Sequence, residues 1–169
     1  MTGPAAAQRI RRARLRDRHA IRHLVDVAYS RQEQALGLAR SARWTSFWWH
    51  ILNRRLWLLE NGQELVGLIG LLDGSIQLFI FLVTILPSAQ RRGFGRMLVE
   101  FAENEARRRG LTRLQLDTPE GFVNAIEFYR HLGFVDIGRQ DRNGYVSVVM
   151  MKCPEAKALP LAAASAPRR

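Results

Sequence analysis

The stretch Gln90-Arg91-Arg92-Gly93-Phe94-Gly95 is the most informative part of this chain, because it joins a long apolar strand pattern to an amphipathic helix pattern. A loop that presents successive backbone N–H groups at the start of a helix is suited to hold an anion. Two glycines leave room for a phosphate to approach the backbone, and three arginines add positive charge beside it. We therefore predict a pyrophosphate-binding loop. Its expected ligand-binding residues are Gln90, Arg91, Arg92, Gly93, Phe94, Gly95 and Arg96.

This loop differs from two common nucleotide-binding loops. It lacks the Gly-Lys-Ser/Thr of nucleoside triphosphatases and the Gly-x-Gly-x-x-Gly of dinucleotide-binding folds. A tight strand-to-helix connection without any ligand remains the alternative interpretation of the two glycines alone.

Hydrophobic periodicity and turn residues on either side of the loop predict an α/β domain with a mixed sheet. Strands are expected at Ile10–Leu15, Leu56–Glu60, Leu65–Leu72, Ser75–Leu86, Leu111–Thr118, Phe134–Gly138 and Tyr145–Met151. Helices are expected after a capping Asp17, at Ser41–Arg54, at Gly95–Arg109 and at Val123–His131. We expect one domain over residues 9–152, with flexible tails at residues 1–8 and 153–169.

Composition narrows the class of protein. Cys153 is the only cysteine, which excludes an internal disulfide and fits a cytoplasmic location. The four histidines lack metal-ligand spacing, so we predict no metal. The apolar segment Leu65–Leu86 is long enough to span a membrane, but Asp73-Gly74 in its middle predicts a hairpin instead. The net charge of +11 comes from scattered arginines and indicates a solvated surface, with a nucleic-acid partner as the less favoured alternative.

Three segments resemble a known family. The run Ile85–Arg96 is similar to the acetyl-CoA motif Gln/Arg-x-x-Gly-x-Gly/Ala of the GCN5-related N-acetyltransferase (GNAT) family. The run Ala125–Phe134 resembles its second signature, Ala-x-x-x-Tyr-x-x-x-Gly-Phe, and Ile10–Asp17 resembles its opening strand and helix cap. The resemblance spans about residues 9–152, with the three segments in the family's order.

The resemblance implies a mixed, mostly antiparallel sheet that splays at the acyl-CoA site and is flanked by about four helices. It also implies an acyl-CoA-dependent N-acyltransferase that uses acetyl-CoA as its acyl donor. The backbone of Val83, Thr84 and Ile85 would bind the pantetheine arm as an added strand would, and Arg91 through Arg96 would bind the pyrophosphate.

Two residues are candidate catalytic groups. Tyr129 lies where the family often has a tyrosine that protonates the departing CoA thiolate, and a phenol with an ordinary pKa near 10 carries its proton at pH 7. The alternative is an aromatic residue packed in the core. Asp117 lies where relatives resembling ribosomal-protein N-terminal acetyltransferases have a glutamate base. A cap or turn residue before Thr118-Pro119-Glu120 is an equal alternative for Asp117.

The chain departs from the family pattern at two places. Phe122 stands where the family often has asparagine, and Ser75–Leu86 contains no carboxylate where many relatives carry a glutamate base. The general base is therefore Asp117, another residue such as Glu60 or His50, or a chain of water molecules.

The missing strand carboxylate bears on the acceptor amine. An α-amino group with a pKa of about 7.7–8.0 is partly neutral at pH 7, whereas a lysine with a pKa near 10.4 is neutral about once in several thousand molecules. The sequence favours a low-pKa acceptor, either a protein or peptide N-terminal α-amino group or a small-molecule amine.

Two alternatives stay open: a non-catalytic CoA-binding regulatory module, and an acetyltransferase acting on an RNA-borne substrate. A homodimer is also compatible with the sequence. An aromatic cluster could line the acceptor pocket or the core: Trp44, Phe47, Trp48 and Trp49.

Overall fold

The computed structural model describes residues 7–36, 47–142 and 145–154, and side chains within these ranges except at 29–36, 47 and 48. One sheet has the strand order β1-β2-β3-β4-β5-β7-β6, and only β4 and β5 are parallel. The strands are β1 (Gln8–Arg12), β2 (Leu56–Asn61), β3 (Glu64–Asp73), β4 (Gln77–Ile85), β5 (Arg113–Pro119), β6 (Val135–Asp141) and β7 (Val146–Lys152). The helices are α1 (Arg18–Leu36), α2 (Phe47–Leu52), α3 (Phe94–Arg108) and α4 (Val123–His131), with 3-10 turns η1 (Leu15–Asp17) and η3 (Pro87–Ala89). The predicted mixed, mostly antiparallel sheet is confirmed.

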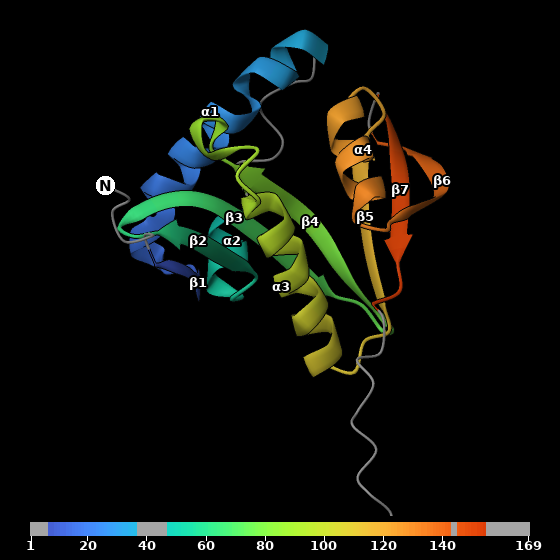
Figure 1. Ribbon diagram of the computed structural model, residues 1–169, viewed down its shortest axis with the longest axis horizontal. Helices are drawn as coiled ribbons and strands as arrows, with labels where there is room; N and C mark the ends of the chain where they lie inside the picture. Colours follow the sequence, from blue (N-terminus) through green and yellow to red (C-terminus); the bar gives the residue numbers. More distant parts are fainter. Residues whose placement is uncertain (1–6, 37–46, 143–144, 155–169) are drawn as a thin grey trace, which may run out of the picture.

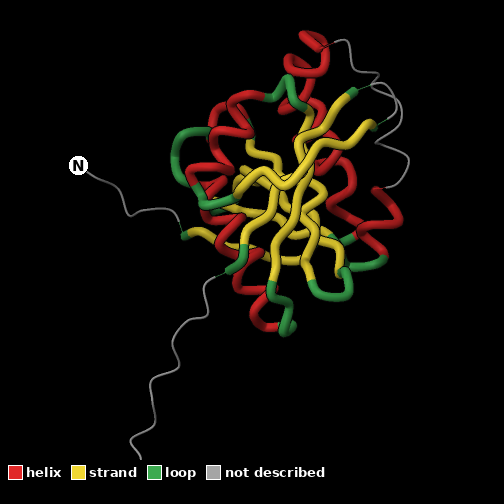
Figure 2. Tube along the Cα trace, turned by 90° about the vertical axis from the view of Figure 1, so that its right-hand side faces the viewer, coloured by secondary structure: helices red, strands yellow, loops and turns green. Residues whose placement is uncertain are grey.

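Helices cover both faces of the sheet (Figure 2). Leu98 of α3 and Ile126 of α4 belong to one buried cluster, and Figure 1 shows α3 crossing the sheet and α4 beside β5 and β7. Ile21 and Leu24 of α1 pack with Ile51 of α2 in a second cluster on the opposite face. Helices therefore cover both sides of the central strands β3 and β4, which explains why these strands are apolar along most of their length.

Two glycines end the helices that flank the predicted site. Gly110 after α3 and Gly133 after α4 have φ values of +70° and +86°. In α4, Gly133 N–H donates to Arg130 O (2.9 Å) and Phe134 N–H donates to Tyr129 O (3.1 Å), the two hydrogen bonds of a Schellman motif. The predicted helix ends at these glycines are confirmed.

The apolar segment from Leu65 onward forms two strands. β3 and β4 are joined at Gly74, whose N–H donates to Gln77 O at 2.8 Å. No helix in the described part of the chain is long and apolar enough to cross a membrane. The predicted hairpin around Asp73-Gly74 is confirmed.

Two predictions about the N-terminal half differ from the structure. β1 covers Gln8–Arg12 rather than Ile10–Leu15, because the chain turns into η1 and leaves Leu15 exposed. Asp17 does not cap α1. Its carboxylate accepts the Arg14 N–H (2.8 Å) and two hydrogen bonds from Arg11, and so holds the turn before the helix.

The helix expected over Ser41–Arg54 can be compared with the structure only from residue 47 onward. There the observed helix is shorter than expected. α2 ends at Leu52, because Arg54 takes a positive φ of 56°. Residues 41–46, including Trp44, lie outside the described ranges, as do the side chains of Phe47 and Trp48. Trp49 is 62% exposed and so is not a core residue.

Glu105 links the end of α3 to the sheet and gives a prediction about acid stability. It accepts hydrogen bonds from Arg108 and Arg109, and Arg109 also pairs with Asp73 of β3. The hydrogen bonds from Arg108 are the main reason that the pKa of Glu105 is lowered from 4.5 to about 2; burial opposes them and Arg109 reinforces them. This stabilisation is present above pH 4.5 and is lost as the pH falls toward 2.

We therefore expect Glu105→Gln to lower the free energy of unfolding at neutral pH by about 1–3 kcal/mol, and by much less near pH 2. Urea unfolding of both proteins at several pH values measures the difference. A difference that stays constant over this range would contradict the assignment.

Candidate functional site

The sheet opens between β4 and β5. The two strands pair only over Gln77–Ile80 and Arg113–Leu116. Beyond this point β4 continues along β3 and β5 continues along β7, so the two strands diverge (Figure 1). The predicted splay of the sheet is present, and it leaves a wedge between two strand edges.

A β-bulge at Phe81 marks the start of the opening. Gly70 pairs with Leu82 and Leu71 pairs with Ile80, so Phe81 is the extra residue in β4. A Cβ atom on Gly70 would lie 2.4 Å from Cζ of the Phe81 ring, so only glycine fits there. Since a bulge bends its strand, this pair accounts for the departure of β4 from β5.

The predicted anion loop lies at the N-terminus of α3, beside this opening. The first backbone donor bonded within α3 is Met97 N–H, which donates to Gly93 O at 3.1 Å. Among the described residues, none accepts a hydrogen bond from the N–H groups of residues 93–96. Gly93 has φ +85°, and nothing lies within 4 Å of the position its Cβ would occupy. Within the described ranges these four backbone donors therefore have no acceptor, as an anion site requires.

Gly95 has a packing role beside the predicted one. The prediction that it lets a phosphate approach the backbone stays a prediction. A Cβ on Gly95 would lie 3.0 Å from Cζ of Phe128 in α4. Gly95 therefore permits close packing of α3 against α4.

The three arginines of the loop are exposed and are not engaged by carboxylates. Arg91 has a positive φ of 60°, and the guanidinium carbon of Arg92 lies 5.2 Å from the centroid of the Phe94 ring. Neither they nor Arg96 form an ion pair within the described ranges. Gln90 Nε2 donates to Ile85 O at 3.3 Å, which ties the loop to the end of β4.

The predicted pantetheine-binding residues form the last part of β4. Val83 and Ile85 pack against the α3 side, and Thr84 pairs with Leu68 of β3. Thr84 is 2% exposed, and its Oγ1 has no hydrogen-bond partner among the described residues. These three residues therefore border the opening on the β4 side, and their binding of the pantetheine arm stays a prediction.

Tyr129 is buried in α4 and has a structural role in addition to the predicted catalytic one. Its ring centroid lies 5.6 Å from that of Phe134 and 5.2 Å from that of Phe128. The contact with Phe134 is the apolar contact that accompanies a Schellman motif. Much of the Tyr-x-x-x-Gly-Phe signature is thus explained by the way α4 ends.

Asp117 lies inside β5, paired with Val149 of β7, so it does not cap the turn after the strand. Leu116 and Thr118 are buried, and Leu116 belongs to the α3/α4 cluster; Asp117 therefore lies on the opposite face. Its carboxylate accepts a hydrogen bond from Arg142 Nε at 3.1 Å. Sequence reasoning missed this partner, because Arg142 is 25 residues away.

The other two candidate bases differ in position. Glu60 lies on β2 and accepts a hydrogen bond from Arg11 at 2.7 Å, and both β3 and β4 separate β2 from the opening. His50 of α2 stacks on Phe81, with ring centroids 4.4 Å apart, and its buried Nδ1 has no hydrogen-bond partner in the described part of the chain. Burial, and then the charge of Arg55, lower the pKa of His50, which keeps its ring neutral at pH 7. His50 thus lies next to the bulge, whereas Glu60 is held in a structural ion pair.

No group of three His, Cys, Asp or Glu side chains within the described ranges is arranged to hold a metal ion. Phe122, which replaces the family's asparagine, is a buried residue preceding α4.

Comparison with known proteins adds to this geometry. A model of the Acetyltransferase (GNAT) family matches residues 18–134. The peptidyl-lysine N-acetyltransferase YiaC of Escherichia coli (strain K12) is 27% identical over 103 residues, which cover 60% of this chain and 65% of that protein. The [ribosomal protein bS18]-alanine N-acetyltransferase of Salmonella typhimurium is 40% identical over 55 residues, covering 32% and 37%. The matches thus span less than two thirds of these relatives.

Solved structures share the fold over nearly the whole chain. The ribosomal-protein-S18-alanine N-acetyltransferase from Escherichia coli has a TM-score of 0.73 at 19% identity, covering 91% of this chain and 99% of that one. The acetyltransferase yncA from Salmonella typhimurium, solved with acetyl-CoA, has a TM-score of 0.68 at 20% identity, covering 93% and 99%. At these identities the likeness shows the fold.

Proposed function

The chain belongs to the GNAT family of acetyltransferases, and we propose that it transfers the acetyl group of acetyl-CoA to a primary amine, with a protein or peptide N-terminal α-amino group as the acceptor. The observation that supports this most is the combination of the splayed β4–β5 edge with the unsatisfied N–H groups of residues 93–96. The loop suits the pyrophosphate, the part of β4 beyond its pairing with β5 suits the pantetheine arm, and the wedge suits the thioester.

The reaction forms a C–N bond and breaks a C–S bond. A neutral amine attacks the thioester carbonyl, and the tetrahedral intermediate collapses with loss of the CoA thiolate. Backbone N–H groups at the opening stabilise the oxyanion. We assign Tyr129 to protonate the thiolate and Asp117 to accept the proton that the amine loses. His50 is the second candidate base, because it lies at the bulge where the wedge begins.

The curated relatives leave the acceptor class open, since one acts on a peptidyl lysine and the other on an alanine of a ribosomal protein. The only amine of an N-terminal alanine is its α-amino group. No carboxylate lies on β4, and Asp117 is already paired with Arg142. A weak base suits an acceptor that is partly neutral at pH 7, which favours the α-amino group.

The variant Asp117→Asn distinguishes the two acceptor classes. An amine with a pKa near 8 is neutral in about one molecule in ten at pH 7, so loss of the base should lower kcat/KM by at most about tenfold for an α-amine. The loss should disappear as the pH approaches 9. Rates with an N-terminal peptide between pH 6 and 9 measure it. A loss approaching a thousandfold that is confined to a lysine peptide would instead support a lysine acceptor.

The activity itself can be tested with a panel of peptides, small amines and aminoacyl-tRNA, read by release of the free CoA thiol. Calorimetry with acetyl-CoA supplies the binding constant on the same protein. Binding with no thiol release across the panel would support a non-catalytic CoA-binding module. Release only with aminoacyl-tRNA would support an RNA-borne substrate, and absence of binding at millimolar acetyl-CoA would refute the proposal.

A further inference from the structure

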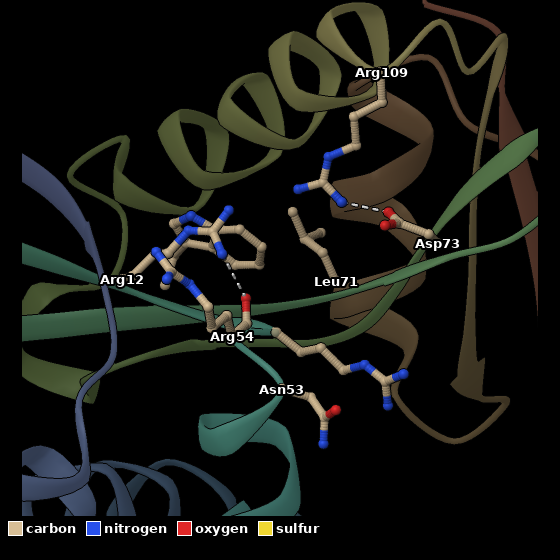
Figure 3. A pocket seen from close by; sticks show the side chains of 8 residues that line it. Arg12, Asn53, Arg54, Leu71, Asp73 and Arg109 are labelled. Carbon is tan, nitrogen blue, oxygen red and sulfur yellow. Dashed lines mark hydrogen bonds and ion pairs between the residues drawn. The ribbon is translucent and has the colours of Figure 1, made fainter.

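A second charged pocket lies at the other end of α3, away from the loop (Figure 3). It has a volume of about 320 Å³ and is lined by the ends of β1, β3 and α3 and by the connection from α2 to β2. Four arginines line it against one carboxylate, that of Asp73. They are Arg12, Arg54, Arg55 and Arg109.

Two carboxylates, Asp73 and Glu105, pair with Arg109 and leave the other three arginines of this pocket without an ion pair in the described ranges. Figure 3 shows Arg12 next to the carbonyl of Arg54, to which it donates a hydrogen bond at 3.3 Å, and Arg109 turned toward Asp73. Within the described ranges, Arg12, Arg54 and Arg55 have no carboxylate partner. Burial, and then the charge of Arg54, lower the pKa of Arg12, and the charge of Glu105 opposes them only in part. An anion in the pocket would relieve this repulsion.

Arg54 has a left-handed backbone conformation, which glycine adopts with less strain. Arg54 N–H donates to Ile51 O (3.0 Å) and Arg55 N–H donates to His50 O (2.9 Å), which together form a Schellman motif at the end of α2. The left-handed residue of such a motif is usually glycine, yet here it is arginine with φ 56°. The fold therefore does not require this side chain, whereas a charged pocket does.

We propose that this pocket is a second anion site, which binds a small phosphate-bearing molecule. Guanidinium groups match phosphate oxygens in pairs, and three uncompensated arginines suit a ligand with two or more negative charges. The Trp57 ring is already covered, since the guanidinium carbons of Arg12 and Arg109 lie 5.0 and 5.7 Å from its centroid. Recognition would therefore rest on charge rather than on ring stacking.

The pocket is distinct from the proposed cofactor loop. Arg109 follows the last residue of α3, a helix of 15 residues. A helix of this length separates its two ends by about 22 Å. The same phosphate group cannot occupy both places.

Inorganic pyrophosphate is a suitable probe, titrated by calorimetry into the full chain at constant ionic strength. The titration uses the Gly93→Asp variant, in which the loop before α3 should not bind pyrophosphate. The result therefore does not depend on whether the chain binds acetyl-CoA. We expect saturable binding that Arg54→Gly weakens about 10–100-fold, since one charge-assisted contact is lost. Arg54→Gly should melt no lower than its parent, because glycine suits the positive φ.

Arg9→Gln is the matched control, because Arg9 is an exposed arginine on β1 outside the pocket and should leave binding unchanged. Equal affinity in the Arg54→Gly variant, or no binding at millimolar pyrophosphate, would overturn the proposal. Retention of an RNA oligonucleotide without pyrophosphate binding would also overturn it.

Discussion

Replacing Gly93 with aspartate should lower the affinity for acetyl-CoA by at least about 100-fold, which corresponds to the loss of two charge-assisted N–H contacts of about 1.5–3 kcal/mol each. Gly93 has φ +85°, and its missing Cβ points into open space. An aspartate at this position would place a negative charge where the pyrophosphate is proposed to lie. Among non-glycine residues, Asp and Asn tolerate the left-handed conformation best, so the protein should remain folded.

Gly93→Asn provides the control, because it has nearly the same shape without the charge. Calorimetry with acetyl-CoA should order the three proteins as Gly93, then Asn, then Asp, from tight to weak. Thermal melting should show that both variants are folded. Wild-type affinity in the aspartate variant would mean that the N–H groups of residues 93–96 do not hold the cofactor.

Features that depend on short stretches of chain could be predicted from the sequence. The loop begins α3 within one residue of the expected position, and the glycines at 110 and 133 end α3 and α4. Asp73-Gly74 marks the β3–β4 connection. In each case one or two residues determine the backbone conformation, so the sequence carries the information locally.

Features that depend on contacts between distant segments could not be predicted. The bulge at Phe81 is fixed by Gly70 on the neighbouring strand, and the role of Gly95 depends on Phe128 of another helix. The pairing of Asp117 with Arg142 likewise joins separate strands and loops. A glycine in a sequence shows that a side chain is absent, but only the fold shows whether a ligand or a neighbouring ring takes its place.

Replacing Tyr129 with phenylalanine should slow acetyl transfer by about 10²–10⁴-fold if its hydroxyl protonates the departing thiolate. The aromatic ring remains, so the contact with Phe134 that ends α4 is kept. We therefore expect stability and acetyl-CoA affinity to change little. This substitution separates the proton donor from the ring, which Tyr129→Ala would not do.

Single-turnover rates at saturating acetyl-CoA measure the chemical step directly, because product release does not enter them. Tyr129→Leu is the companion variant, in which the ring contact is lost as well, and it should lower the melting temperature where phenylalanine does not. A purely structural role predicts that activity follows stability, so that leucine impairs transfer and phenylalanine does not. The proposed proton transfer predicts instead that the phenylalanine protein binds acetyl-CoA, melts like the parent and transfers slowly. A phenylalanine variant within twofold of the parent rate would leave the tyrosine only its part in the core and in the end of α4.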